Sequence, residues 1–272
     1  MPSTVADVNA VVERLWPLSG AESWDAPGLV SGSPTANVSH ILLTVDVVSE
    51  VVAEAIDLTA NLIVSHHPLL LRGVTSIAED RYKGAMLASL IRGNCALIAA
   101  HTNADVVETG TSAALAAALH LVDIAPITHG ETPTRGIGRT GRLVEPTTLG
   151  RLARRLGDIL PATASGIRVS GDYDRPVQSV ALCGGAGDSL LSEPAVLAAD
   201  VYITSDLRHH PASEARENAR VSGGPALIDV SHWASEWLWL ESAAGELSDA
   251  LPGVSVTVSE LRTDPWDFSI VQ

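Results

Sequence analysis

Three short segments of the chain carry histidines and carboxylates at spacings that suit a metal site. In SHHP two histidines directly follow an apolar run, and in HTNAD and SHWASE a histidine precedes a carboxylate by four residues. Residues four apart in a helix lie on one face. Together the segments supply nitrogen and oxygen ligands from His66, His67, His101, Asp105, His232 and Glu236. Such a set without thiolate favours Zn, Mn, Fe(II) or Ni over Cu(I) or an iron–sulfur cluster.

Each segment also has a simpler explanation. A histidine at a strand end is more often hydrogen-bonded or exposed than bound to metal, and a single H-x3-D or H-x3-E pair arises by chance. Stray histidines occur outside these segments, namely His40, His120 and His129. The coincidence of three segments nevertheless favours a metal site. His66 and His67 would point to opposite faces of a continuous strand, so both reach one site only if the chain bends before Pro68.

A fourth segment, SDLRHHP, is the strongest rival for metal or substrate binding. It carries Asp206, His209 and His210. These residues either lie beside the site or stand at the exposed start of a helix, where Asp206 would be a cap. We favour a position next to the site over direct metal ligation.

Glycines and arginines offer two candidate anion sites. GGAGDSLL (184–191) follows an apolar run and precedes a helix, so its amides could hold a phosphate, but it lacks a P-loop lysine. A tight glycine turn is the simpler interpretation. Arg135, Arg139 and Arg142 either meet an anion or are turn residues in solvent. Nucleophilic serine or cysteine catalysis has no positive support in the motifs.

The candidate residues follow apolar runs that are typical of strands. Strands are predicted at 40–47, 61–68, 95–105, 179–185, 200–206, 226–232 and 254–261, and within 135–149 and 167–171. Helices are predicted at 4–16, 50–60, 80–92, 111–121, 148–159, 211–220 and 233–247, and a loop at 24–34. This alternation predicts an α/β fold with parallel-rich sheets flanked by helices. Sites in such sheets form at the carboxyl ends of strands, where the histidine segments lie.

The change in pattern after residue 122 indicates two α/β lobes. We expect a first lobe at 1–125, completed by a C-terminal strand at about 250–272, and a second lobe at 126–249.

Composition narrows the class of protein. The 272 residues include 17 Lys and Arg against 32 Asp and Glu, and the net charge of −15 disfavours nucleic acid and anionic membranes as partners. A substrate phosphate would therefore need a local cationic patch or a bound metal. Cys95 and Cys183 lie in separate apolar stretches and are expected to be buried, reduced thiols of a cytoplasmic protein. We expect neither a signal peptide nor a membrane span.

The order of the motifs resembles that of a known family. SWDAPGL, SHHPLL, AAHTNAD, GIGRTGRL, VALCGGAGDS, ADVYITSDLRHH and IDVSHWASE cover nearly the whole chain. They are similar to those of the Nif-three-like dinuclear-metal family, whose members are often called GTP cyclohydrolase I type 2 homologues. The resemblance implies a two-lobed α/β fold, a dinuclear metal site between the lobes and a toroidal homohexamer. It also implies the compact family form, because 125–190 is too short for a large inserted middle domain.

The resemblance further implies roles for the candidate residues. Two divalent cations, of Zn, Mn, Fe or Ni, would be held by His66, His67, Asp105, His232 and Glu236. His101 would be either a further ligand or the catalytic acid–base.

Two hypotheses about function follow. The first is a dinuclear-metal-dependent hydrolase in which His101 transfers protons. If the family label applies, the substrate is GTP, opened hydrolytically at its imidazole ring, although a metallophosphatase or amidohydrolase would use the same centre. The second is a non-catalytic metal-binding or regulatory protein. An open coordination position and a nucleotide-sized pocket would favour the enzyme.

Overall fold

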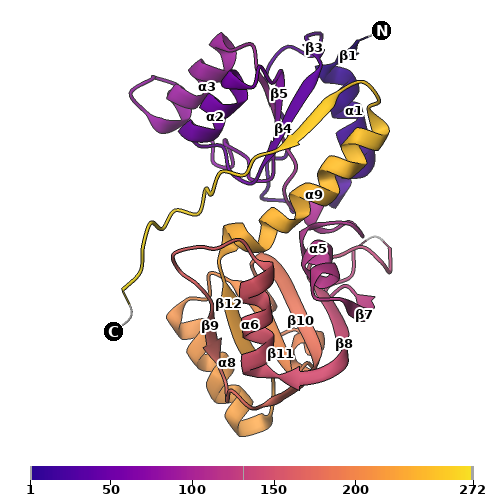
Figure 1. The fold of residues 1–272 in the computed structure, drawn as a ribbon, viewed down its shortest axis with the longest axis vertical. Coiled ribbons are helices and arrows are strands. Elements are labelled where there is room, and N and C mark those ends of the chain that lie inside the picture. The colour runs from indigo at the N-terminus through magenta and orange to yellow at the C-terminus, as the bar shows by residue number, and fades with distance from the viewer. Residues whose placement is uncertain (1, 131, 271–272) are drawn as a thin grey trace. The chain divides into compact units, whose positions relative to one another are not determined.

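The computed structural model of the chain describes residues 2–130 and 132–270. The chain folds into two compact units. The first unit is Met1–Ala104 with Leu240–Thr263, and the second is Asp105–Trp239 with Asp264–Gln272. Each unit has its own sheet and helices (Figure 1), so the fold is mixed α/β.

The main sheet of the first unit has five strands in the order β13-β4-β5-β6-β2. Neighbours from β13 to β6 are parallel, whereas β2 pairs antiparallel with β6. The central strands are apolar along almost their whole length and buried, as expected for strands covered on both faces. The strand bounds are β2 Gly28–Ser31, β4 His40–Thr44, β5 Leu62–Ser65, β6 Ala96–Ala99 and β13 Ser255–Val258, and a separate pair is formed by β1 Ser3–Thr4 and β3 Asn37–Val38.

The helices of the first unit bury one apolar face each. Helix α1 begins after a capping box, in which the Thr4 hydroxyl accepts from the Asp7 N–H and the Asp7 carboxylate accepts from the Thr4 N–H. Val51 and Ala55 of α2 belong to a core cluster that also contains Ile63 of β5. The bounds are α1 Val5–Leu15, the 3-10 turn η1 Leu18–Gly20, α2 Ser49–Asp57, α3 Tyr82–Arg92 and α4 Thr102–Asp105.

The sheet of the second unit has six strands in the order β7-β8-β10-β11-β12-β9. Only β10, β11 and β12 are parallel to one another, and β8, β7 and β9 add antiparallel pairs on the two sides. The strand bounds are β7 Leu121–Ala125, β8 Arg139–Thr148, β9 Arg168–Ser170, β10 Pro176–Ala186, β11 Val201–Ser205 and β12 Ala226–Val230.

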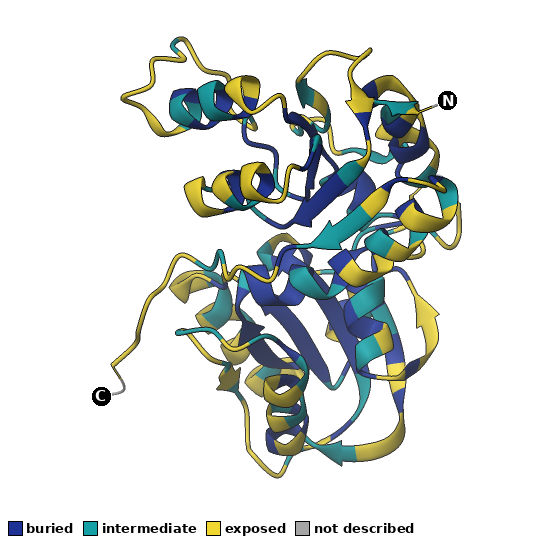
Figure 2. Cartoon of the chain, turned by 45° about the horizontal axis from the view of Figure 1, so that its top comes forward, coloured by how far each residue is buried: buried dark blue, intermediate teal, exposed yellow. Residues whose placement is uncertain are grey.

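The helices of the second unit surround a core that includes the fully buried Tyr202. Figure 2 shows that the strands are largely buried, while the helices expose their outer faces. No helix in the described ranges has the length and apolar character needed to cross a bilayer. The bounds are α5 Thr111–Ala118, α6 Leu149–Ile159, the 3-10 turn η2 Asp188–Leu190, α7 Pro194–Leu197, α8 His209–Ser222 and α9 His232–Ala250. The part of α9 from Leu240 onward belongs to the first unit.

Four strands lie where the sequence predicted none, namely the two-residue β1 and β3 and the longer β2 and β7. β2 falls within the predicted loop 24–34, because its four residues follow a proline and begin with Gly28, which has φ of 107°. β7 begins at the last residue of the predicted helix 111–121, and four of its five residues are exposed, which hides the strand pattern. Both strands pair antiparallel, so the sheets are mixed.

The bounds of the two units follow from contacts between their elements. The second unit begins at Asp105 because α5 packs on β10 and β7 pairs with β8. Its C-terminal part begins at Asp264, whose carboxylate accepts from the Ser231 hydroxyl at 2.6 Å. The predicted C-terminal strand is limited to β13, and Val271 and Gln272 lie outside the described residues.

Candidate metal centre

His66 and His67 stand where strand β5 ends. Its last residue is Ser65, whose hydroxyl donates to the His67 carbonyl at 2.9 Å across a bend in the chain. The two imidazole rings lie next to each other, with centroids 5.0 Å apart and planes at 41°. The bend that both histidines need in order to face one site is therefore present.

Each histidine of the first unit's cluster is held through Nδ1. The partners are a backbone carbonyl and two carboxylates: Ala100 O at 2.9 Å from His66, Asp46 Oδ1 at 2.7 Å from His67 and Asp25 Oδ1 at 2.8 Å from His101. A carbonyl or carboxylate oxygen accepts hydrogen bonds, so Nδ1 of each ring carries the proton and donates. In the neutral ring Nε2 then carries the lone pair, which is the state of a metal-binding imidazole.

The three rings converge within the first unit. One ligand atom from each of His66, His67 and His101 lies within 4.8 Å of the other two. The His101 centroid is 5.2 Å from that of His66 and 5.4 Å from that of His67. His66 is completely buried, and the other two are partly exposed. This three-histidine cluster has the donor atoms and the spacing to hold a divalent cation.

Both carboxylate oxygens of Asp25 are engaged beside His101. The second oxygen accepts from the Thr102 N–H at 3.0 Å and from the Thr102 hydroxyl at 2.5 Å. Burial opposes ionisation of this carboxyl, but its hydrogen bonds with His101 and Thr102 outweigh burial and hold the pKa of Asp25 well below its usual value. The exposed Trp24 ring meets the His101 ring edge-on, with centroids 5.8 Å apart.

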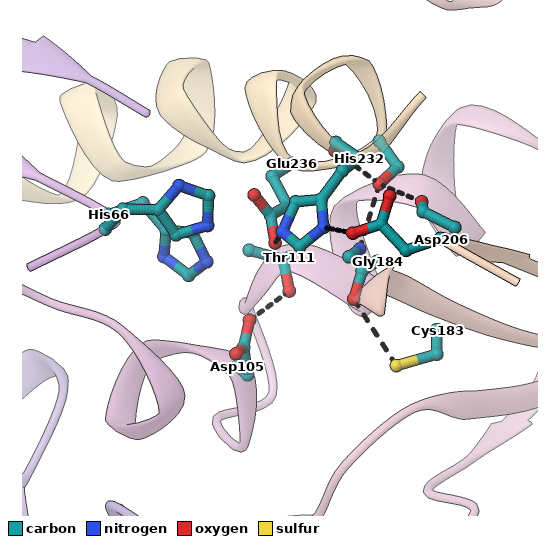
Figure 3. Close-up of polar contacts among 12 residues, drawn as sticks. His66, Asp105, Thr111, Cys183, Gly184, Asp206, His232 and Glu236 are labelled. Carbon is teal, nitrogen blue, oxygen red and sulfur yellow. Dashed lines mark hydrogen bonds and ion pairs between the residues drawn. The ribbon is translucent and has the colours of Figure 1, made fainter. Parts of the chain in front are cut away.

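In the second unit, His232 lies between two carboxylates (Figure 3). Its Nδ1 is 2.8 Å from Asp206 Oδ2, and its Nε2 is 3.0 Å from Glu236 Oε1. His232 begins α9, so Glu236 lies on the same helical face, as the spacing predicts. Burial disfavours the charged imidazole, but the Glu236 charge and the hydrogen bonds to both carboxylates raise the pKa of His232 to about 11.

Asp105 is the last residue of α4. Its Oδ1 accepts a short hydrogen bond from the hydroxyl of Thr111, the first residue of α5 (Figure 3). The predicted helical turn after His101 is present, because the Ala104 N–H donates to the His101 carbonyl at 2.8 Å. The carboxylate is thus oriented by α5.

The glycine loop at the end of β10 makes room for the His232–Glu236 pair. Gly185 has φ of 69°, and a Cβ there would lie 2.3 Å from Glu236 Oε1. The Gly184 N–H donates to Ser112 Oγ at 3.1 Å, and the Gly185 N–H donates to Ser235 Oγ at 2.9 Å. These two amides bind protein hydroxyls, which supports the tight glycine turn over a phosphate cradle.

The rival segment SDLRHHP divides into two parts. Asp206 contacts His232 and is therefore adjacent to the pair, as favoured from the sequence. It does not cap α8, which begins at His209 after Arg208. His209 and His210 are exposed at the start of that helix.

Of the arginine candidates, Arg139 is structural, and so are the two cysteines, whereas Arg142 is exposed. Arg139 is 2% exposed and donates to the backbone carbonyls of Gly136, Gly138 and Val107, so it is neither in solvent nor open to an anion. Burial raises the pKa of both Cys95 and Cys183 to about 12, which keeps the thiols protonated.

Sequence reasoning missed the carboxylates that orient the histidines. Asp46 follows β4 in HILLTVDV, at the carboxyl end of a strand, where the histidine segments were also found. Its other oxygen accepts from the Thr263 hydroxyl at 2.5 Å. Asp25 lies in SWDAPGL, a motif of the resemblance to which no role was assigned. Its role depends on a tertiary contact with His101.

Comparison with known proteins supplies the family. The model of Duf34/NIF3 (NGG1p interacting factor 3) matches residues 3–265. The chain belongs to this family. The resemblance inferred from the motifs is thereby confirmed. Among NIF3-family relatives, the Streptomyces coelicolor protein named GTP cyclohydrolase 1 type 2 homolog is 44% identical over 269 residues, covering 96% of this chain and 93% of the relative. The Clostridium perfringens protein of the same name is 30% identical and covers 96% of this chain and 98% of that relative.

Solved NIF3-family structures share the fold. The Staphylococcus aureus protein SA1388 is 28% identical, with a TM-score of 0.89 over 99% of this chain and 100% of that one. A Bacillus cereus protein related to NIF3 is 24% identical, with a TM-score of 0.89 and the same coverage. The mixed α/β fold is therefore that of the NIF3 family.

Proposed function

We propose that this NIF3-family protein is a metal-dependent hydrolase that uses two divalent cations. The observation that carries the proposal is the three-histidine cluster, in which each ring is held at Nδ1 by an acceptor, so that Nε2 is the ligand atom of His66 and His67 and the base of His101. The proposed ligands are His66, His67, Asp105, His232 and Glu236. The proposal requires the ligands of the first unit and those of the second to share the cations.

The donor set is suited to such cations. Imidazole nitrogens and carboxylate oxygens without thiolate are typical of Zn, Mn, Fe(II) and Ni sites. Like the cluster histidines, His232 has an acceptor at its Nδ1, here the Asp206 carboxylate. Cations bound there would supply Lewis-acid activation of water and substrate.

His101 is the proposed acid–base. Asp25 keeps the proton on its Nδ1, so Nε2 takes a proton from attacking water and returns it to the leaving atom. The name carried by the relatives makes GTP the first substrate to test, with opening of its imidazole ring as the expected reaction.

The test is turnover by protein reloaded with Mn, Zn or Fe, measured with GTP and a panel of phosphoesters and amides. We expect His66→Ala and Glu236→Ala to lose both bound metal and turnover. We expect His101→Gln to keep its metal and lose about 100- to 10,000-fold in turnover. His129→Ala, at an exposed histidine, is the matched control and should retain both.

Absence of turnover in metal-loaded wild-type protein would contradict the hydrolase and leave the non-catalytic metal-binding protein. The toroidal homohexamer belongs to the same proposal. Light scattering should then give six times the 28.3 kDa of one chain.

A further inference from the structure

The chain after β13 runs without helix or strand to Ile270, the last residue that the structure describes (Figure 1). We call Glu260–Ile270 the C-terminal segment. Its residues are exposed except for Thr263 and Asp264, which are partly buried. Thr263 is the last residue of the first unit, and Asp264 begins the C-terminal part of the second. An otherwise exposed segment is therefore held at two neighbouring residues.

Thr263 holds the carboxylate that orients His67. Its hydroxyl donates to Asp46 Oδ2 at 2.5 Å, and Asp46 Oδ1 accepts from His67 Nδ1 at 2.7 Å. One carboxylate oxygen is thus engaged by the C-terminal segment and the other by the imidazole ring. A carboxylate held at both oxygens cannot rotate without breaking a hydrogen bond. Thr263 therefore restricts the His67 ring through Asp46.

Asp264 acts at the start of helix α9. Its Oδ2 accepts from the Ser231 hydroxyl at 2.6 Å, and its Oδ1 accepts from the Trp266 N–H at 3.1 Å. The Ser231 oxygen accepts in turn from the Ala234 N–H at 3.3 Å, which is the hydrogen bond of a helix N-cap. Because the Ser231 proton is donated to Asp264, a lone pair of the same oxygen can face the helix amide.

The first turns of α9 carry two proposed metal ligands. The helix begins at His232, directly after Ser231, and Glu236 follows about one turn later. Ser231 is buried, so its hydroxyl proton needs an acceptor in the protein, and Asp264 supplies it. A carboxylate near a helix N-terminus also interacts favourably with the helix dipole. Asp264 therefore fixes the backbone from which both ligands project.

We propose that Thr263 and Asp264 are positioning residues of the metal centre, an inference that rests on the proposed function. Thr263 acts on His67 through the Asp46 carboxylate, and Asp264 acts through the cap of α9 on the ligands of that helix. Two neighbouring residues of the C-terminal segment thus orient proposed ligands of both units.

The test measures the affinity of the full chain for Zn²⁺ and for Mn²⁺ by competition with a chelator. Loss of an orienting partner typically weakens metal binding by about 10- to 100-fold. We expect Thr263→Val to weaken binding by about tenfold, and we expect Thr263→Ser, which keeps the hydroxyl, to restore it. Thr35→Val, at an exposed threonine of the first unit, is the matched control and should bind as wild type does.

A double-mutant cycle tests whether Thr263 acts through Asp46. In an Asp46→Ala background, Thr263→Val should cause no further loss of affinity, because the partner of the hydroxyl is already absent. A general loss of packing would instead add to the effect of Asp46→Ala. Equal losses in the two backgrounds would overturn the role of Thr263, as would wild-type affinity in Thr263→Val.

We expect Asp264→Asn to weaken metal binding by about tenfold, because the single amide oxygen cannot take both acceptor positions. Asp267→Asn, an exposed change of the same charge in the same segment, should bind as wild type does. In chelated protein, amide hydrogen exchange at Ala234 should be faster in Asp264→Asn and unchanged in Asp267→Asn. Unchanged affinity in Asp264→Asn would overturn its role. Lower affinity with unchanged exchange would also overturn it, because the carboxylate would then act through its charge and not through the cap.

These measurements separate the positioning roles from the proposed function. If wild type binds metal and turns over a substrate while both variants bind metal as wild type does, the positioning roles fail and the hydrolase stands. If metal affinity depends on both residues but no substrate is turned over, the hydrolase fails and the positioning roles stand. Wild-type protein that binds neither cation would overturn both.

Discussion

At the scale of single residues, the carboxylates behind the histidines decide what the imidazoles can do. Asp25 and Asp46 fix the tautomer of His101 and His67, and Asp206 holds Nδ1 of the charged His232 ring. A ring that is free to rotate or to change tautomer would bind metal more weakly, and loss of such a partner typically costs 10- to 100-fold in affinity, as an order of magnitude.

Asp25→Asn should destabilise the metal-free protein in a pH-dependent way. The pKa of Asp25 is lower in the folded protein than the unfolded value of about 3.9, so its stabilising effect is present above about pH 4 and is lost as pH falls through the folded value. We expect the variant to lose about 2 kcal/mol of unfolding free energy near neutral pH, because hydrogen bonds to an ionised group are lost. Urea unfolding of chelated protein at neutral and acidic pH measures this.

The difference between wild type and Asp25→Asn should shrink in acid. Asp249→Asn, at an exposed site on α9, should change little at any pH. A loss in Asp25→Asn that stays constant down to strongly acidic pH would show that the carboxylate charge is not what stabilises the site.

Metal binding should release a proton from His232. Its pKa of about 11 means that the ring is charged in the metal-free protein throughout the neutral range, and a cation must displace that proton. The affinity for the cation should therefore rise by about tenfold per pH unit because of this ring alone, up to pH values well above neutral. In Asp206→Asn this rise in affinity should level off at a lower pH than in wild type. Calorimetry in buffers of different ionisation enthalpy counts the protons, and a wild-type plateau near the ordinary histidine value of about 6.5 would contradict the expectation.

At the scale of elements, the sites lie where strands end. β5, β11 and β12 each finish next to a residue of the site, and the following turn or helix orients it. The glycine loop after β10 has a complementary role, because Gly185 leaves the space that Glu236 fills.

Gly185→Ala should lose bound metal, whereas Gly166→Ala should not. Both glycines have positive φ, so each substitution costs about 1 kcal/mol of backbone strain. Only at Gly185 would the new methyl group also displace the Glu236 carboxylate, since nothing lies within 4 Å of a Cβ at Gly166. Metal content by mass spectrometry, with thermal unfolding of both variants, separates the two effects. Equal metal content in the two variants would mean that the Glu236 carboxylate is not needed for metal binding.

Sequence patterns predicted the central strands and long helices but not the antiparallel strands. Apolar runs such as LIVS and HILLT are buried on both faces, so their composition alone identifies them. β7 and β2 are short and partly exposed, and only pairing with a neighbouring strand defines them. The candidate ligands were found by residue type and spacing. Asp25 and Asp46 were not assigned, because their roles follow from contacts far apart in the sequence.

At the scale of the whole molecule, each unit contributes an incomplete set of ligands. Of the proposed ligands, the first unit has His66 and His67, and the second has Asp105, His232 and Glu236. The dinuclear centre that we propose draws on both of these sets.

A crystal structure of metal-loaded protein, with anomalous data collected at the metal edge, tests this most directly. We predict two anomalous peaks, each with ligands drawn from His66, His67, Asp105, His232 and Glu236, and with both units represented. Peaks elsewhere, or a single ion held by one unit while the other unit's residues point away from it, would contradict the shared dinuclear centre.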